Sequence, residues 1–401
     1  MLLMLFMSSC TKSDLEDGSG YNLVRLYDDT LPDPRNDAIH IAAADGRLLM
    51  TYGRTFSQIL FVNGAATFPP PAENVWMLTD DEGNLIRRDL FLTGLSIGDV
   101  TSLPDNSFFV VMYTGIPNLW GGPEWTMQIM RIDPNGVMGP VSLLSIPTIH
   151  PPPYQSFYDI LIRSVLNGNV LISFYYGGAD GGSGSFVGEM NTQGSFLWHT
   201  EFDNRGVSGC VGTPDGGYMI SGRWWDLNQN AGMYIMKTNS TFDSTWSRFM
   251  VPKTGTDGRV QVASAGNGNY WLNYVNSYNL TATSHLLEFN PAGEIVDSNF
   301  YMPDIAPYNI NTVMLQHGSS GLYMSYTNSI SNVNSIILEK FNSAYATFDG
   351  ELNITKQSFF QQQTSDIINS GCRMKDGRIA CFGLIQSYDR RYYKPELIII
   401  N

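Results

Sequence analysis

The sequence predicts an all-β fold, a β-propeller of seven four-stranded antiparallel blades, and three features of the chain support this prediction. Turn sequences of the Asp-Gly or Asn-Gly type recur about every fifty residues, a spacing typical of repeat architectures. A second class of turn follows later in most repeats. Finally, each end of the chain carries a part of a repeat that the other end lacks, so the two ends together make one blade.

The repeat is clearest in residues 206–250, where four apolar runs are separated by a turn, an aromatic loop and a second turn. We interpret these runs as strands a to d, in chain order. Asp-Gly between two alternating apolar runs is a strong hairpin signal, because both central residues of a type I′ turn have positive φ. Over the whole chain, the a–b turns are expected at Asp45-Gly46, Asp105-Asn106, Asn167-Gly168, Asp215-Gly216, Asn267-Gly268, Ser319-Ser320-Gly321 and Asp376-Gly377.

The chain ends predict how the ring closes. The seventh repeat stops at strand c, 396–401, whereas residues 21–28 form a strand with no repeat before it. If residues 21–28 complete the last repeat, no sheet edge is left open. We therefore expect a single propeller domain over 21–401, preceded by a signal and tether over 1–20. The c–d turns of the other repeats are expected at 79–84, 132–137, 190–195, 289–294 and, in degenerate form, 341–351.

The fourth repeat resembles the propeller repeat of Bacteroidota surface lipoproteins, which runs Asp-Gly-Gly, an apolar strand with Gly, Lys-Thr after the next strand, and Trp in the last strand. Trp198 keeps the tryptophan of strand d in the third repeat, while repeats one, two, five and six lack it. The resemblance extends over about 21–401 and implies the fold alone, because propellers host unrelated activities. The matching residues of the fourth repeat are Asp215, Gly216, Gly217, Gly222, Lys237, Thr238 and Trp246.

The N-terminus resembles that of a lipoprotein. Residues 1–10 are apolar and end in Ser8-Ser9-Cys10, which is similar to a lipobox, and residues 11–20 look like the acidic export signal and tether of surface lipoproteins. The resemblance implies an outer-membrane protein held at the cell surface by a lipid on Cys10; an ordinary apolar N-terminus with a chance cysteine is the alternative. No run of about eighteen apolar residues occurs, so the lipid is the only membrane attachment that we expect.

The composition disfavours several partners. The net charge is −14 and no Lys/Arg run or basic aromatic stripe occurs, which argues against nucleic acid. The five histidines show no metal-ligand spacing, and no Cys or His cluster suggests zinc. We expect neither a metal nor a cofactor, and we expect a monomer.

The cysteines suggest a disulfide, because an exported chain can form one and Cys10 would be consumed by the lipid. If Asp376-Gly377 is a two-residue turn, Cys372 lies opposite Cys381 at a non-hydrogen-bonded position, where Cα atoms approach to about 4.5 Å. We predict a Cys372–Cys381 disulfide in the closing blade, with two buried reduced thiols as the alternative. Cys210 has no partner and is expected in the core.

The two faces of the predicted ring differ. The a–b and c–d turns emerge on one face, which we expect to be structural because its turns are short. The b–c connections on the other face are longer and rich in aromatic residues, which suit stacking on sugars or apolar peptide side chains. Packing between blades is the alternative role for any one of these aromatic residues. The ligand-binding candidates are Trp120, Trp125, Tyr176, Trp224, Trp225, Tyr278, Tyr388 and Tyr392.

Aspartates near the starts of strands a form a second group of candidates, because these strands line the central channel. Clustered carboxylates bind cations, shift one another's pKa for acid–base catalysis, or hold sugar hydroxyls. Their offsets from the a–b turns differ between repeats, so a local structural role is the alternative. The group comprises Asp37, Asp99, Asp159, Asp257 and Asp366, of which Asp37, Asp159 and Asp366 are the catalytic candidates.

Together these features favour a non-catalytic, lipid-anchored cell-surface protein that binds a ligand, preferably a glycan, through its aromatic loops. One alternative is a propeller glycoside hydrolase or lyase, which needs two carboxyl groups about 5–10 Å apart. The other is a protein-binding scaffold or adhesin at the outer membrane. A broad apolar face would favour the scaffold, whereas a narrow funnel would favour a sugar.

Overall fold

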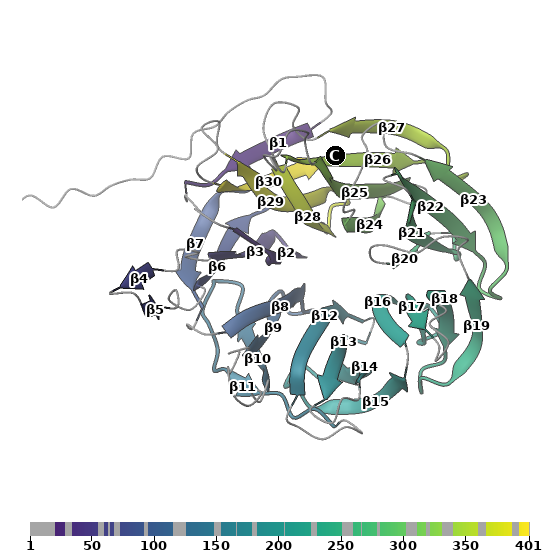
Figure 1. The fold of residues 1–401 in the computed structure, drawn as a ribbon, viewed down its shortest axis with the longest axis horizontal. Coiled ribbons are helices and arrows are strands. Elements are labelled where there is room, and N and C mark those ends of the chain that lie inside the picture. The colour runs from purple at the N-terminus through teal and green to yellow at the C-terminus, as the bar shows by residue number, and fades with distance from the viewer. Residues whose placement is uncertain are drawn as a thin grey trace, which may run out of the picture.

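The chain folds into a ring of β-sheets, which we describe from a computed structural model (Figure 1). The part of the chain that the structure describes contains thirty strands and no helix, and the all-β propeller fold is confirmed. No helix in this part is long and apolar enough to cross a membrane. The described residues are 21–28, 34–54, 60–62, 65–67, 73–91, 95–114, 126–147, 154–165, 167–178, 183–203, 205–225, 231–250, 260–265, 267–278, 281–301, 311–317, 321–330, 340–359, 366–386 and 393–400.

Within these residues, seven four-stranded antiparallel sheets form, which we number as blades 1 to 7 in chain order. Blade 1 contains β2 (Pro34–Ala44), β3 (Arg47–Arg54), β6 (Glu73–Asp80) and β7 (Leu85–Leu90). Blade 2 contains β8 (Leu95–Ser102), β9 (Phe108–Thr114), β10 (Thr126–Ile132) and β11 (Ser142–Leu143). Blade 3 contains β12 (Tyr154–Ser164), β13 (Val170–Gly178), β14 (Ser183–Met190) and β15 (Phe196–Asp203).

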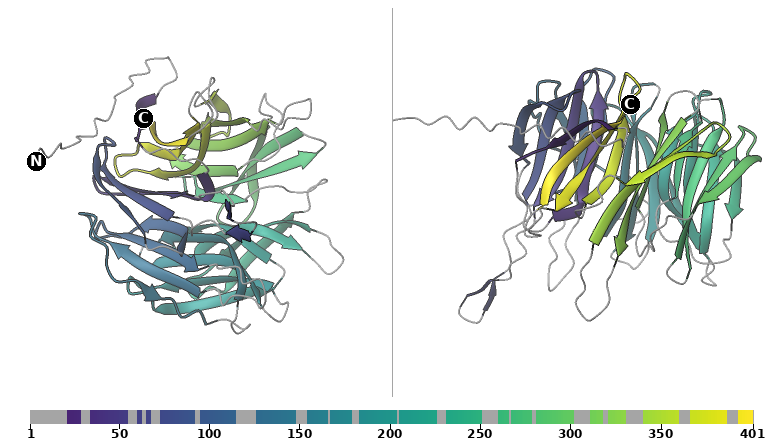
Figure 2. Two further views of the ribbon diagram at one scale, coloured as in Figure 1. Left: turned by 60° about the vertical axis from the view of Figure 1, so that its left-hand side comes forward. Right: turned by 90° about the horizontal axis from the view of Figure 1, so that it is seen from above.

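Blade 4 contains β16 (Arg205–Gly212), β17 (Tyr218–Trp225), β18 (Ala231–Thr238) and β19 (Ser244–Met250). Blade 5 contains β20 (Gln261–Ser264), β21 (Tyr270–Tyr278), β22 (Thr281–Phe289) and β23 (Ile295–Tyr301). Blade 6 contains β24 (Asn311–His317), β25 (Gly321–Ile330), β26 (Lys340–Phe348) and β27 (Ile354–Phe359). Blade 7 contains β28 (Asp366–Arg373), β29 (Ile379–Gln386), β30 (Tyr393–Ile400) and β1 (Tyr21–Leu26). A two-stranded hairpin, β4 (Leu60–Val62) and β5 (Ala65–Thr67), projects from the ring between β3 and β6 (Figure 2).

Blade 7 confirms the predicted ring closure, because its outermost strand comes from the N-terminus. β1 pairs antiparallel with β30, and the backbone N–H of Tyr27 extends the pairing by donating to the carbonyl of Pro395 at 3.0 Å. Arg378 in the a–b turn of this blade forms ion pairs with Glu82 of blade 1 at 3.3 Å and with Asp376 at 2.6 Å. Backbone pairing therefore joins the two chain ends within blade 7, and the ion pair between Arg378 and Glu82 joins this blade to blade 1.

The a–b turns differ from the expected two-residue form in blades 2, 3, 4, 5 and 7. In blade 4, Thr213 N donates to Gly217 O at 2.8 Å and Gly216 N donates to Thr213 O at 2.9 Å, which leaves a three-residue loop. Gly216 alone has positive φ, at 81°, as in a type I turn followed by a left-handed residue. Blade 1 keeps the two-residue loop, with Ala44 opposite Arg47.

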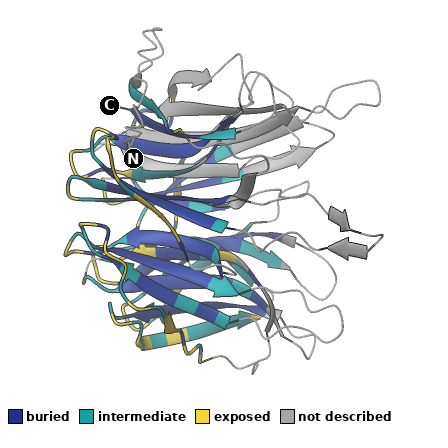
Figure 3. Cartoon of the chain, turned by 90° about the vertical axis from the view of Figure 1, so that its left-hand side faces the viewer, coloured by how far each residue is buried: buried dark blue, intermediate teal, exposed yellow. Residues whose placement is uncertain are grey.

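The core lies between neighbouring blades, where side chains of adjacent sheets interdigitate. One cluster contains Met50 of blade 1 and Phe382 of blade 7, and another contains Trp76 of blade 1 and Phe108 of blade 2. Exposed residues gather in the turns and on the outer strands (Figure 3). The blades are thus held as one rigid ring, with strands a at its centre.

Candidate functional site

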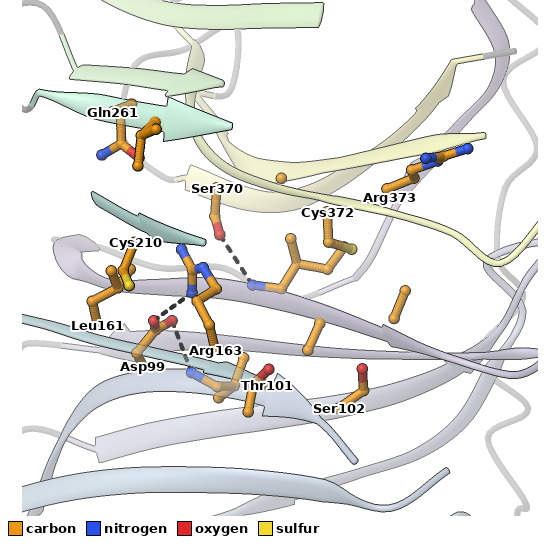
Figure 4. A pocket seen from close by; sticks show the side chains of 16 residues that line it. Asp99, Thr101, Ser102, Leu161, Arg163, Cys210, Gln261, Ser370, Cys372 and Arg373 are labelled. Carbon is orange, nitrogen blue, oxygen red and sulfur yellow. Dashed lines mark hydrogen bonds and ion pairs between the residues drawn. The ribbon is translucent and has the colours of Figure 1, made fainter. Parts of the chain in front are cut away.

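A cavity of about 250 Å³ lies at the centre of the ring, between the strands a of six blades (Figure 4). In five of these blades the lining residues come from the second half of strand a, close to the a–b turn; in blade 5 they are Gln261 and Val262, which begin β20. The described cavity therefore lies in the half of the channel that is nearer to the a–b turns. Polar or charged lining residues are Asp99, Thr101, Ser102, Arg163, Gln261, Ser370 and Arg373.

Irregular pairing in strands a turns polar side chains toward the next blade. The register shifts between Ile97 and Asp99 in β8, between Val207 and Gly209 in β16, and between Ile368 and Ser370 in β28. Such bulges re-aim side chains and leave backbone groups unpaired. Because strand a is the inner edge of each sheet, its N–H groups need acceptors from elsewhere.

Three junctions between blades supply such acceptors, and Asp99 and Ser370 do so from the same position of strand a. Asp99 accepts from Ile162 N at 2.9 Å, Ser208 Oγ accepts from Val260 N at 3.1 Å, and Ser370 Oγ accepts from Ile41 N at 3.1 Å. The first joins blades 2 and 3, the second joins blades 4 and 5, and the third joins blades 7 and 1. Two of the three acceptors are neutral serines, and Asp99 is the exception.

Asp99 is buried at the centre of a hydrogen-bond network. Oδ2 accepts from Ile162 N and from Arg163 Nη1, both at 2.9 Å, and Oδ1 accepts from Val100 N at 2.8 Å. Nδ1 of His40 lies 3.2 Å from Oδ1. Burial alone raises the pKa of this carboxyl, but the charge of Arg163 and the bond with His40 outweigh burial and lower the pKa to about 2. Asp99 is therefore ionised at neutral pH, with both oxygens engaged.

Arg163 presents a free edge to the cavity. Its Nη1 donates to Asp99 and to its neighbour's carbonyl, Ile162 O, at 2.6 Å. In the part of the chain that the structure describes, its Nε and Nη2 have no partner, and 45% of the side chain is exposed. Arg373, at another part of the lining, has no hydrogen bond or ion pair within the described residues. Sequence analysis missed four residues of this region, namely Arg163, His40, Gln261 and Arg373. For the two arginines a signal was available, because each is a cation on an inner strand just before an a–b turn.

The cysteines require a correction, because the predicted Cys372–Cys381 disulfide is not formed. The three-residue turn places Cys372 opposite Ala380 and Cys381 opposite Gly371, so a shift of one residue puts the two side chains on opposite faces of the sheet. Cys210, Cys372 and Cys381 are free thiols. Burial raises the pKa of all three, that of Cys381 to about 12, so they remain protonated. Cys210 is buried in the core, as expected.

Of the three aspartates chosen as catalytic candidates, Asp159 alone has a side chain within the described part of the structure. Asp159 is exposed in β12, with φ of 50°, and does not line the cavity. Asp37 in β2 and Asp366 in β28 have described backbones, but their side chains lie outside the described part, as does the whole of Asp257. Asp99, which the sequence grouped with them, lines the channel. Within the described residues, no three His, Cys, Asp or Glu side chains gather to hold a metal ion.

Among the aromatic candidates, the structure assigns packing roles to two. Tyr176 is fully buried in the core, where its hydroxyl bonds to Glu201, so its predicted ligand contact is wrong. Trp224 is half-buried and packs edge-on against Phe249, with ring centroids 6.0 Å apart. Trp225 and Tyr278 end strands β17 and β21, and their side chains are outside the described part. Trp120, Trp125, Tyr388, Tyr392 and the lipidation candidate Cys10 also lie outside the described residues.

Comparisons with solved structures identify the same fold. No family model and no curated protein matches the chain. The polysaccharide lyase Uly1 is 11% identical with a TM-score of 0.55, covering 91% of this chain and 90% of its own. The WD40 domain of Toxoplasma gondii coronin is 10% identical with a TM-score of 0.52, covering 94% and 86%. A GH93 α-L-arabinofuranosidase of Fusarium graminearum is 9% identical with a TM-score of 0.49, covering 75% and 91%. At these identities the likeness shows the propeller fold and nothing of activity.

Proposed function

We propose that this protein is a non-catalytic, carbohydrate-binding propeller whose ligand occupies the central channel. The observation that carries the proposal is the cavity between the strands a, which is lined by hydrogen-bonding side chains on a rigid wall. Ligand sites are typically concave and largely preformed, with a few fixed polar groups that set orientation. The same fold carries a polysaccharide lyase, so a propeller of this length is compatible with a carbohydrate ligand.

The lining of the cavity disfavours catalysis. Among the described lining residues, Asp99 is the one carboxylic acid, and its pKa of about 2 leaves it no proton to give. Glycoside hydrolysis by two carboxyl groups needs a second one about 5–10 Å away across the cleft. The saturated hydrogen bonds of Asp99 suit a structural carboxylate, and this favours binding over hydrolysis.

The proposal includes the cellular setting. A lipid on Cys10 would hold the propeller at the outer membrane, facing outward, with residues 11–20 as its tether. The chain would act there as a monomer that contacts a glycan, with the aromatic b–c loops as a second contact region on the opposite face. Metabolic labelling with a palmitate analogue, lost in Cys10→Ser, tests the anchor.

The ligand-binding test is a glycan array probed with the Cys10→Ser chain. Gln261 lines the cavity, where its Nε2 donates to Ser208 O at 3.0 Å. Gln261→Leu should lower the affinity for the best glycan at least tenfold, because it replaces a polar lining group with an apolar one. Gln193→Leu, in an exposed c–d turn, is the matched control and should bind normally.

Two outcomes would contradict the proposal. A folded chain that binds no glycan at all would exclude carbohydrate binding. Glycan binding that survives Gln261→Leu but is lost in Trp224→Ala or Trp225→Ala would move the site from the channel to the aromatic loops.

A further inference from the structure

We infer that the ligand carries a carboxylate, as an acidic glycan does, and that Arg163 recognises it. This inference rests on the proposed function, since it names the class of carbohydrate that the channel binds. Three independent observations lead to it: the free edge of the guanidinium, the charge of the cavity lining, and the unusual chemistry of one junction between blades.

The guanidinium of Arg163 is fixed on one side and open on the other. Nη1 is held by Asp99 at 2.9 Å (Figure 4). It also donates to Ile162 O at 2.6 Å. The remaining Nε and Nη2 form the edge that binds a carboxylate through two parallel hydrogen bonds. Because Asp99 already holds the group in place, little side-chain entropy remains to be lost when a ligand binds.

The cavity lining is positive although the chain is acidic. The charged lining residues are Arg163, Arg373 and Asp99, while the whole chain has a net charge of −14. Asp99 and Arg163 form an ion pair whose charges cancel, so Arg373 leaves the described lining with one net positive charge. A carboxylate is favoured in such a site, whereas a neutral sugar gains nothing from the charge.

The junction between blades 2 and 3 carries an ion pair at its capping position that the same position of the junction between blades 7 and 1 lacks. The equivalent backbone N–H at the junction of blades 7 and 1, that of Ile41, is capped by the hydroxyl of Ser370. A hydroxyl is therefore sufficient for the structural task. The Asp99–Arg163 pair adds a charged, oriented guanidinium at this one junction, and we attribute that addition to ligand recognition.

The test compares sugars that differ only in the carboxylate. Calorimetry measures the binding of each sugar to the Cys10→Ser chain. The first pair is a galacturonic acid trisaccharide and the neutral trisaccharide obtained from it by carboxyl reduction. Every acidic glycan of the array is titrated in the same way, together with its reduced form. We expect at least tenfold tighter binding of the acidic member of the best pair. Arg163→Gln should abolish this preference, and Arg163→Lys should restore part of it because the charge returns without the bidentate edge.

The controls separate this inference from simple anion binding and from misfolding. Arg88→Gln, on the outer strand β7, removes an equal charge far from the channel and should keep the preference. Circular dichroism and thermal melting establish whether each variant is folded. If Arg163→Gln does not fold, the preference for the acidic sugar is measured in Arg163→Lys and Arg373→Gln instead. Inorganic phosphate and acetate are titrated as competitors.

Each outcome decides between the claims. Equal binding of acidic and reduced glycans, or a preference that survives Arg163→Gln, would overturn the assignment of Arg163 while leaving carbohydrate binding intact. Competition by phosphate or acetate as strong as that of the acidic glycan would show a general anion site and would also overturn it. Absence of any glycan binding would instead defeat the proposed function itself.

Discussion

Replacing Asp99 with asparagine should destabilise the ring, by an amount that can be worked from the hydrogen bonds of its carboxylate. Its pKa is lowered from 3.8 to about 2, because Arg163, His40 and Ile162 N outweigh the effect of burial. At about 1.4 kcal/mol per pKa unit, the ionised group stabilises the folded state by roughly 2 kcal/mol at neutral pH. Asparagine also turns an N–H₂ group toward donors such as Val100 N, so the total loss should reach about 3–5 kcal/mol.

The sign of the pH dependence follows from the lowered pKa. Above pH 4 both folded and unfolded chains carry an ionised aspartate at this position, and the stabilisation is fully present. As the pH falls from about 4 toward 2, the unfolded chain binds a proton before the folded one does, and the stabilisation is lost. The gap between the original chain and Asp99→Asn should therefore narrow over this range.

The assay is urea unfolding followed by tryptophan fluorescence at pH 7, 4 and 2.5, with Asp203→Asn as the control. Asp203 is exposed at the end of β15, so its replacement should change the midpoint little at any pH. A loss below about 0.5 kcal/mol at pH 7, or a gap that stays constant down to pH 2.5, would refute the account of Asp99 as an ionised, interblade acceptor.

Three further predictions concern the blades and their turns. In blade 4, Lys237 of strand c binds Asp215 of the a–b turn at 2.6 Å. In blades 3 and 5 the same position of strand c is Glu189 or Glu288, which accepts a hydrogen bond from a turn asparagine. Lys237→Glu should therefore destabilise the fold, and adding Asp215→Asn should recover about 1 kcal/mol in a double-mutant cycle. Alkylation without reductant should label Cys210, Cys372 and Cys381 in the unfolded chain and label them slowly in the native one, and mass spectrometry checks both. Removing residues 1–28 strips β1 from β30 and should produce oligomers by size-exclusion chromatography, because it opens the edge of blade 7; a stable monomer would show that β1 is dispensable.

The fold was predictable from the sequence because turns and apolar alternation are local signals. The closing of the ring followed from two incomplete repeats, and the pairing of β1 with β30 confirms it. The register of the last hairpin was not predictable, since Asp-Gly occurs both in two-residue loops, as in blade 1, and in three-residue loops, as at Asp376-Gly377 in blade 7. One extra residue in the loop moved Cys372 from Cys381 to Ala380 and removed the disulfide.

The candidate site was harder to predict because it depends on contacts between repeats. Asp99 and Ile162 are 63 residues apart and meet only because a bulge in β8 turns the carboxylate toward the next blade. A sequence pattern within one repeat cannot report such a bulge or the partner across the junction. Aromatic residues mislead for a related reason: Tyr176 lies in a region that the pattern assigns to a loop, yet β13 continues through it and buries its ring.

The position of Arg163 in the ring explains why a site there can be selective without a mobile loop. Its strand, β12, is held by β13 on one side and by the Asp99 cap from blade 2 on the other. A side chain on such a wall is preorganised by the same contacts that stabilise the blades. The net charge of −14 repels acidic ligands at long range, but salt screens this repulsion beyond about 8–10 Å. An acidic glycan that reaches the channel then meets the two arginines of the lining. The channel is thereby the place where the carboxylate of such a glycan is recognised.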